Sequence, residues 1–335
     1  DRLERGPAYG QIRGTRDPRL RGDRLAPAEA GGRATNEWPT YRHDAQRSGR
    51  TQASVPANLR RAWRVELGGR LTSPTVAGGK VFVASVDEHT ILAIDADSGQ
   101  AAWHFTGGAR IDSPPSIDQG RVLFGCRDGY VYSVRASDGQ LAWRLQAARE
   151  GRRIAACGQL ESASPVVGSV LLNDGVVYAT AGRSSYVDGG IDLYRLKPET
   201  GGILSRTTIY SPDPKTGKQP DHIAPAVMPG ARADILTGDD SCVYMRDMAF
   251  DKNGVELPEG KAHLFTLTDF LDDTWPHRSY WIFGTQCSLA TGCSSRDKNL
   301  IFGRVLVFDE SKIYGYGRSQ VHWSNQLQDG PYRLF

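Results

Sequence analysis

The sequence has few cysteines and lacks the short motifs in which cysteines bind metal or haem. Its 335 residues contain five cysteines, and no two are adjacent or spaced as Cys-x-x-Cys. This spacing excludes zinc-ribbon and haem-attachment sites. The odd number leaves at least one thiol without a partner inside the chain. Cys287 and Cys293 lie close together in a stretch rich in Gly, Ser and Thr. The sequence leaves open whether they form a disulfide or are two free thiols.

Long apolar runs and a strong charge of either sign are also missing. No run of 18 apolar residues occurs, so the sequence predicts no membrane-spanning helix. Lys and Arg number 41 against 38 Asp and Glu, and a net charge of +3 gives no reason to expect nucleic acid as a partner. We expect no metal site, because five of the seven histidines are scattered and none of them has metal-ligand spacing: His43, His89, His222, His263 and His322.

Motifs of common enzyme classes are absent as well. The chain has no Gly-x-Ser-x-Gly, no phosphate-binding glycine loop and no dinucleotide fingerprint. The chain begins at Asp1, and we expect either a processed chain or part of a longer polypeptide. These absences leave a chain whose most informative feature is its internal repetition.

A tryptophan recurs every 40 residues, at Trp63, Trp103 and Trp143. The intervening sequence repeats too: Lys80-Val-Phe-Val returns as Arg121-Val-Leu-Phe, and Ala93-Ile-Asp-Ala-Asp-Ser-Gly returns as Ser133-Val-Arg-Ala-Ser-Asp-Gly. A 40-residue period with four short apolar runs is typical of a propeller blade. We therefore interpret the three tryptophans as structural side chains wedged between neighbouring blades.

Each repeat predicts four strands joined by tight turns. In the first repeat the apolar runs cover residues 71–76, 80–85, 90–95 and 100–105, separated by Gly, Asp and Ser. Gly99 and Gly139 fall where a hairpin turn needs a positive φ, which glycine adopts without steric cost. The expected fold is an all-β propeller of four-stranded antiparallel blades.

The repeat also predicts the organisation of the chain. Residues 1–35 are rich in Arg, Gly and Pro, cannot build a core alone, and are expected to form an extended arm. Residues 36–335 are expected to form the propeller, with clean blades at 63–105, 106–145 and 160–204 and degenerate blades over 233–320. In the third blade the tryptophan position lapses to Leu204 or a neighbouring residue. The strand units after residue 205 are too few for a standard closed ring, so the ring is expected to be incomplete in this chain.

The repeat Ser-Pro-x-Val, Asp-Gly-x-Val-Tyr, Ala-x-Asp-x-x-Ser-Gly-x-x-x-Trp resembles the PQQ-like repeat of quinoprotein propellers and outer-membrane assembly lipoproteins. The segment Trp38-Pro-Thr-Tyr-Arg-His-Asp44 resembles the one that precedes the first blade in that superfamily. The stretch from Phe270 to Trp281 is similar to large secreted PQQ-like proteins of planctomycete-type bacteria. This resemblance implies the fold, but hardly any particular activity.

The resemblance also provides a test for a quinone cofactor. Quinoprotein dehydrogenases use adjacent cysteines above the quinone and oxygen ligands on Ca²⁺. This chain has no Cys-Cys pair, and Asp239-Asp240 and Asp272-Asp273 are only pairs of carboxylates. We therefore expect neither PQQ nor Ca²⁺ to be bound.

The densest group of chemically versatile side chains lies between residues 272 and 281. Aromatic rings beside Arg and Asp suit a sugar, and Arg with His could hold a small anion. The alternative is that the aromatic residues pack between blades and Asp272 caps a turn. The candidate ligand-binding residues are Asp272, Trp275, His277, Arg278, Tyr280 and Trp281.

Two classes of function remain open. The first is a non-catalytic propeller that binds or assembles other segments or chains outside the cytoplasm, in the periplasm or as a secreted protein. The second is a propeller-fold enzyme, either a quinoprotein oxidoreductase or a carbohydrate-active enzyme. The missing cysteine pair favours the first, and the 272–281 group keeps the second open; the catalytic residues of such an enzyme are not defined by the sequence.

Overall fold

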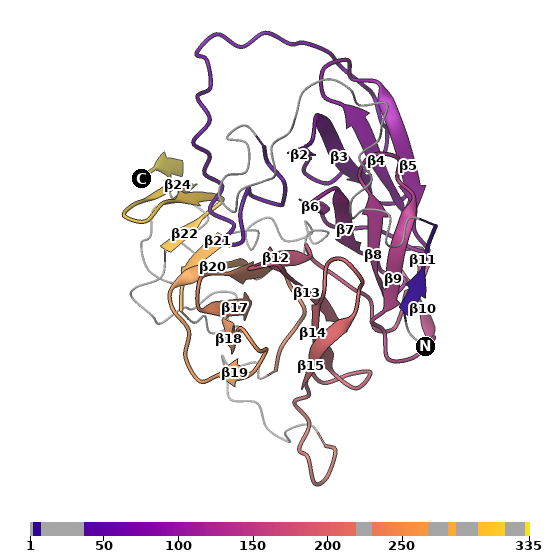
Figure 1. Ribbon diagram of the computed structural model, residues 1–335. Coiled ribbons are helices and arrows are strands. Elements are labelled where there is room, and N and C mark those ends of the chain that lie inside the picture. Colours follow the sequence, from indigo (N-terminus) through magenta and orange to yellow (C-terminus); the bar gives the residue numbers. More distant parts are fainter. Residues whose placement is uncertain (1–2, 8–36, 219–229, 267–280, 286–300, 319–331) are drawn as a thin grey trace.

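The computed structural model describes residues 3–7, 37–218, 230–266, 281–285, 301–318 and 332–335 (Figure 1). These residues form β-strands and loops, with no helix among them and hence none that could cross a membrane. The predicted all-β propeller is confirmed: five blades follow one another, and a further three-stranded sheet comes after them. Cys287 and Cys293 lie outside the described residues.

The two blades with the clear repeat have four antiparallel strands each. The first contains β2 (Thr75–Ala77), β3 (Lys80–Ser85), β4 (Thr90–Asp95) and β5 (Ala101–Thr106). The second contains β6 (Ser116–Asp118), β7 (Arg121–Gly125), β8 (Tyr130–Arg135) and β9 (Leu141–Gln146), and β1 (Leu3–Arg5) adds a fifth strand beside β9. The first strand of the first blade is shorter than the expected 71–76, because residues 71–74 contribute only one isolated bridge, from Leu71 to Ser85.

A two-stranded hairpin, β10 (Arg153–Ala156) and β11 (Gln159–Ser162), separates the second and third blades. The third blade contains β12 (Leu171–Asn173), β13 (Val176–Ala181), β14 (Ile191–Leu196) and β15 (Ile203–Ile209). The fourth contains β16 (Leu236–Gly238), β17 (Cys242–Met245), β18 (Met248–Asp251) and β19 (Glu256–Leu257).

The last two sheets have three strands each in the part of the chain that is described. The fifth blade contains β20 (His263–Thr266), β21 (Trp281–Gly284) and β22 (Ile301–Gly303). The final sheet contains β23 (Val305–Phe308), β24 (Ile313–Arg318) and β25 (Tyr332–Leu334). Leu264, Leu306 and Phe308 form a small core that joins these two sheets.

Each repeat tryptophan docks against the turn of the next blade. The indole N–H groups of Trp63, Trp103 and Trp143 donate to the carbonyl oxygens of Ala96, Ala136 and Pro198, over 2.8, 3.0 and 3.0 Å. The glycines of these turns, Gly99, Gly139 and Gly201, have φ of +71°, +73° and +68°. A Cβ at these glycines would lie 2.7, 2.6 and 2.7 Å from the indole, so the missing side chain makes room for the ring. Trp103 and Trp143 stand third in their strands rather than at the strand ends.

Ser205 takes the tryptophan position in the third blade, one residue after Leu204. Trp103 pairs across its sheet with Ala93, and Trp143 pairs with Ser133. In the third blade the small Ser205 pairs with the large Arg195 instead, whose Nη1 lies 3.3 Å from the serine hydroxyl. In the third blade, the space that a tryptophan fills in the first two blades is therefore filled from the opposite strand, by Arg195.

Residues 37–49, here called the axial segment, join the first strands of several sheets by backbone hydrogen bonds. Trp38 exchanges two bonds of 2.8 Å with Val76 in β2, and Pro39 accepts one from Ile117 in β6. Ala45 accepts one from Gly238 in β16, and Ser48 accepts one from Phe308 in β23. The first strand of the final sheet thus meets the same segment as β2, β6 and β16, the first strands of three blades.

Arg47 holds the axial segment together from inside. The side chain is fully buried and donates to the hydroxyl of Thr40 over 2.6 Å and to the carbonyl oxygens of Tyr41 and Leu236 over 3.0 and 3.1 Å. Burial lowers the pKa of Arg47 to about 10, so the guanidinium is still charged at neutral pH.

Candidate functional site

Of the group expected at 272–281, only Trp281 belongs to the described residues. It begins β21, where it pairs with Thr266 and Gly303. The guanidinium of Arg42 lies 4.8 Å from the centre of its ring, and the ring of Tyr41 lies 6.1 Å away. Trp281 therefore contacts the axial segment. The other predicted residues lie outside the described ranges: Asp272, Trp275, His277, Arg278 and Tyr280.

The connection between the second and third blades forms a second candidate site, which contains the hairpin β10–β11. The hairpin crosses to the first blade, where Gln159 contacts the ring of His89 over 2.6 Å and donates to the carbonyl of Asp87 over 3.2 Å. Its strands present exposed side chains, and Leu160 is 60% exposed. Ala155 lies opposite Leu160 in the hairpin and is also exposed.

Four charged side chains anchor the base of this hairpin. Arg110 and Glu161 form an ion pair in which both side chains are only 1% exposed. Arg127 bridges Glu161 and Asp112, over 3.4 and 2.7 Å. Removing one member of such a buried network leaves an uncompensated charge, which typically costs about 3–5 kcal/mol. The exposed hairpin is thus fixed to a rigid base.

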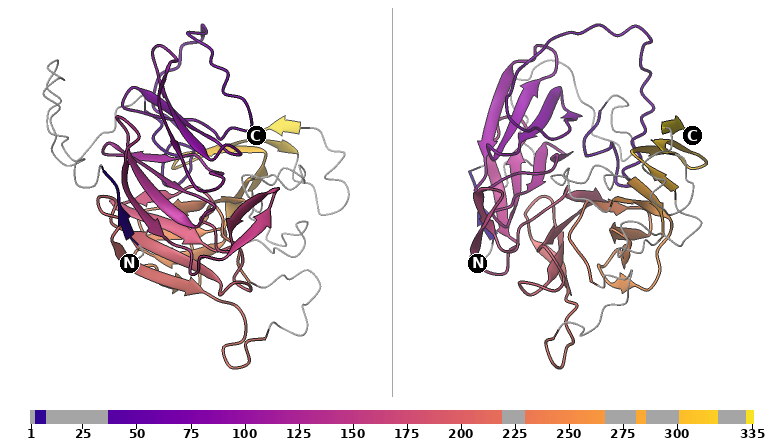
Figure 2. Two further views of the ribbon diagram at one scale, coloured as in Figure 1. Left: turned by 90° about the vertical axis from the view of Figure 1, so that its right-hand side faces the viewer. Right: turned by 180° about the vertical axis from the view of Figure 1, so that it is seen from behind.

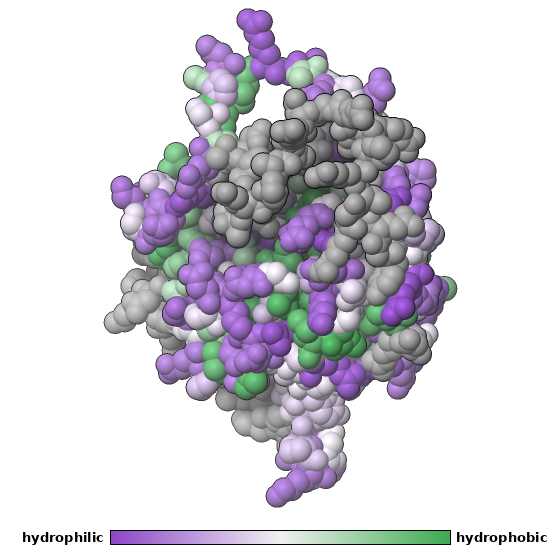
Figure 3. All heavy atoms as spheres, in the orientation of Figure 1, coloured by the Kyte–Doolittle hydropathy of each residue, from purple (hydrophilic) through white to green (hydrophobic). Residues whose placement is uncertain are grey.

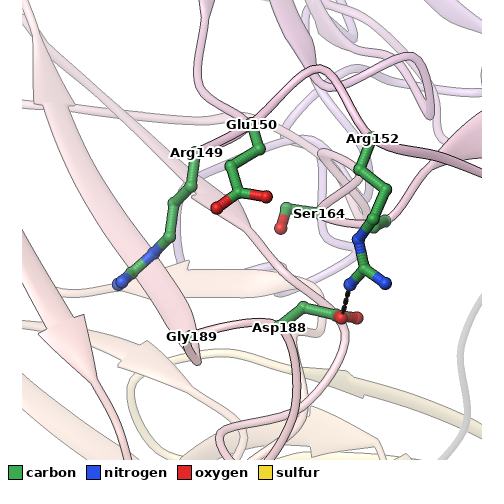
Figure 4. Close-up of a pocket in the computed structure, with 7 residues that line it drawn as sticks. Arg149, Glu150, Arg152, Ser164, Asp188 and Gly189 are labelled. Atoms are coloured by element: carbon green, nitrogen blue, oxygen red, sulfur yellow. Dashed lines mark hydrogen bonds and ion pairs between the residues drawn. The ribbon is translucent and has the colours of Figure 1, made fainter.

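A pocket of about 340 Å³ opens beside the hairpin (Figure 4). Three segments build it: the end of the second blade, the residues before β12, and the turn between β13 and β14. Its lining consists of Arg149, Glu150, Arg152, Ala163, Ser164, Asp188 and Gly189.

Most charges of this pocket are already neutralised by ion pairs. Arg149 donates to both carboxylate oxygens of the buried Asp192, over 2.9 and 2.7 Å. Arg152 and Arg183 both pair with Asp188, the second over 2.9 Å. These ion pairs fix the loops around the pocket, and the loops in turn position the remaining polar groups.

Glu150 and Ser164 are the polar groups left for a ligand. Figure 4 shows the Glu150 carboxylate and the Ser164 hydroxyl turned toward one another across the pocket. No described residue forms a hydrogen bond or ion pair with the Glu150 side chain. A free carboxylate beside a hydroxyl can accept hydrogen bonds from a cationic group, such as an ammonium or a guanidinium.

This pocket was not predicted from the sequence. The signals that could have indicated it are the charged run Arg149-Glu-Gly-Arg-Arg153 between two blades and the expanded turn Arg183–Gly190. Neither signal shows that the two segments meet, because that depends on how the second and third blades pack. Within the described residues, no group of three His, Cys, Asp or Glu side chains could hold a metal ion.

Several solved structures are similar to this chain. A quinohemoprotein alcohol dehydrogenase from Comamonas testosteroni is 19% identical with a TM-score of 0.44, over 54% of this chain and 28% of that one. BamB from Moraxella catarrhalis is 17% identical with a TM-score of 0.43, over 76% and 69%. The quinohemoprotein alcohol dehydrogenase ADHIIG from Pseudomonas putida HK5 is 15% identical with a TM-score of 0.48, over 76% and 39%.

The chain thus spans less than a third of the length of the Comamonas enzyme. No curated protein matches it. Residues 45–216, just over half of the chain, match the family described as outer membrane protein assembly factor BamB, and the chain therefore belongs to this family of PQQ-like repeat proteins.

Proposed function

We propose that this propeller is a non-catalytic binding module that acts outside the cytoplasm, within a larger protein or complex. The family description names an assembly factor of the outer membrane, which supports both the location and the role. The hairpin β10–β11 and the adjacent pocket form the binding surface for a partner polypeptide.

The observation that carries this proposal is the anchored hairpin. A two-stranded ribbon with an exposed Leu160 rests on the buried network around Glu161. The buried charges fix the ribbon in place. A fixed ribbon that presents an apolar side chain is well suited to recognition. The ribbon is held rigidly before binding, which reduces the entropy lost when a partner docks.

The pocket defines the chemistry of one partner group. Glu150 supplies a free carboxylate and Ser164 a hydroxyl, while the neighbouring arginines are occupied by Asp188 and Asp192. A lysine or arginine side chain of the partner fits this arrangement. The carbohydrate or small anion expected at residues 272–281 remains a separate prediction about residues outside the described ranges.

Site-specific photo-cross-linking in the native host tests the proposal. A photoreactive residue at Leu160 should give a defined protein adduct, and Glu150→Gln should reduce its yield at least about fivefold. The same residue at Val255, which is 59% exposed in the turn between β18 and β19, is the control and should give no matching adduct. Equal adducts at both positions, or none at Leu160, would overturn the proposal.

A test for PQQ-dependent activity distinguishes this function from that of a quinoprotein oxidoreductase. The chain lacks the adjacent cysteine pair that lies above the quinone in quinoprotein dehydrogenases. We expect that purified protein supplied with PQQ and Ca²⁺ will not reduce a dye acceptor with any alcohol of a test panel. Robust dye reduction would contradict a non-catalytic role.

A further inference from the structure

The turn between β13 and β14 connects the pocket to a projecting loop, residues 211–218. This turn supplies Asp188 and Gly189 to the pocket lining, and its Ser185 carbonyl accepts a hydrogen bond of 3.0 Å from the N–H of Ser211 in the loop. Figures 1 and 2 show the loop extending beyond the sheets after β15. In Figure 3 the loop projects at the bottom of the molecule and is mostly hydrophilic. The pocket and the loop are therefore neighbours on one face.

The loop presents two lysines from a closed turn. The N–H of Asp213 donates to the carbonyl of Lys218 over 3.0 Å, and the N–H of Gly217 donates to the carbonyl of Asp213 over 2.8 Å. The Asp213 carboxylate accepts a further bond of 2.9 Å from the backbone of Lys215. Lys215 and Lys218 are exposed, and neither ammonium has a partner within the described residues. The loop thus carries the kind of cationic group that suits the pocket.

The surface around the pocket offers a matching carboxylate and apolar side chains. Glu150 is free of ion pairs within the described ranges, whereas Asp188, the other acidic lining residue, is paired with two arginines. Exposed apolar side chains lie on the segments that border it: Leu160 in the hairpin, Val187 in the turn, and Tyr210 directly before the loop. Apolar side chains beside polar groups are typical of contact surfaces between proteins.

We propose that two copies of this chain associate about a two-fold axis, each placing the lysines of its loop in the pocket of the other. The inference rests on the proposed binding role of the pocket, and it names a second copy as the partner that supplies the cation. A two-fold interface brings the same patch of both copies together, so this patch must carry both halves of each contact. The face with Glu150, Lys215 and Lys218 meets this condition.

The charged groups define the register of this interface, and the apolar side chains supply most of the buried surface. An exposed ion pair contributes little affinity by itself. Like charges brought together at an interface oppose association much more strongly. Reversing a charge is therefore the sharpest test, because it converts both symmetry-related contacts into repulsive ones.

Charge reversal, followed by analytical ultracentrifugation of the purified protein, tests the inference. Glu150→Lys, and Lys215→Glu combined with Lys218→Glu, should each raise the dissociation constant of the dimer at least about tenfold. A mixture of these two variants should form a heterodimer within about threefold of the parent affinity, because both contacts are then complementary. Asp97→Lys and Lys197→Glu are matched controls in exposed turns before β5 and β15, and should leave the dimer unchanged.

Zero-length cross-linking identifies the contact itself. A carbodiimide joins a carboxylate to an amine only where the two groups touch. With equal amounts of light- and heavy-isotope protein, we expect peptides that join Glu150 to Lys215 or Lys218 and combine one light half with one heavy half. Such mixed peptides form only between two chains, so they separate a dimer contact from a loop that folds back into its own pocket.

Three results would overturn the inference. These are a monomer at every concentration that stays soluble, a mixture of the reversed variants that associates no better than either variant alone, and Glu150 cross-links within single chains only. The photo-cross-link at Leu160 keeps the two proposals apart. An adduct to a different polypeptide, without a dimer, rejects this inference and retains the binding module. A dimer that gives no Leu160 adduct retains the lysine contact and rejects the hairpin as the binding surface.

Discussion

The contacts that join the first three blades to one another differ in chemistry from the contact between the third and fourth blades, although both occur at the same position of the repeat. From the second blade to the third, Trp143 is buried completely and lies against Gly201. From the third blade to the fourth, the hydroxyls of Ser205 and Thr207 donate to the carbonyls of Asn253 and Gly254, over 3.1 and 2.6 Å. The turn is contacted in both cases, but only the tryptophan contact buries a large apolar surface.

Tryptophan docking therefore depends on three positions, not one. The ring needs a glycine in the next turn and a small residue on the opposite strand, as Trp143 has in Gly201 and Ser133. Where Arg195 fills the opposite position, a serine replaces the ring. These positions are coupled by volume, because protein interiors are close-packed.

The largest expected effect is the loss of a docked ring. Trp143→Ala should lower the free energy of unfolding by about 3–5 kcal/mol, because it removes a fully buried aromatic side chain and leaves a cavity. Urea denaturation followed by circular dichroism would measure it. A loss below about 1 kcal/mol would show that the tryptophan does not hold the second and third blades together.

The glycine of the turn should have the next largest effect. Gly139→Ala introduces a Cβ that would lie 2.6 Å from the ring of Trp103 at a φ of +73°. Gly175→Ala is the matched control, with a φ of +71° and no atom within 4 Å. The control should lose about 1–2 kcal/mol from backbone strain alone, and Gly139→Ala about 1–3 kcal/mol more from overpacking. Equal losses would mean that the ring readily moves aside.

A tryptophan placed in the third blade tests the coupling across the sheet. Ser205→Trp alone should destabilise the protein by about 1–3 kcal/mol, because Arg195 occupies the space opposite. Adding Arg195→Ala should recover at least about 1 kcal/mol, seen as a favourable coupling energy in a double-mutant cycle. Additive effects of the two substitutions would reject the exchange of volume between these strands.

The smallest effect is expected at the hydroxyl contact itself. Ser205→Ala removes one hydrogen bond to the carbonyl of Asn253 and should cost about 0.5–1.5 kcal/mol. The measurement is the same urea denaturation as for Trp143→Ala. A loss as large as that for Trp143→Ala would remove the distinction between the two kinds of blade contact.

The sequence predicts the fold most accurately where these coupled positions repeat. Strands at 80–85 and 90–95 were expected from the 40-residue period and are present as β3 and β4. In the third blade the tryptophan is lost and its place was expected only near Leu204, because the sequence alone does not show that Arg195 fills the space opposite Ser205. The repeat is therefore easiest to read where tryptophan and glycine constrain one another.

The candidate site could not be predicted in the same way. Glu150, Ser164 and Asp188 belong to three loops that the period does not constrain, and they meet only because the second and third blades pack side by side. Nor does the sequence pair Glu161 with Arg110, since the ion pair connects residues 51 positions apart. Local patterns indicate strands and turns, whereas loops from different blades come together through tertiary packing.

Native mass spectrometry of the protein isolated from its host tests most directly whether this propeller works within a larger assembly. We predict a species heavier than the 36.7 kDa of these 335 residues, which contains either additional linked polypeptide or a partner chain in a fixed ratio. Denaturing conditions would then separate a partner from a covalently longer chain. A monodisperse monomer of 36.7 kDa, without any bound polypeptide, would contradict the account.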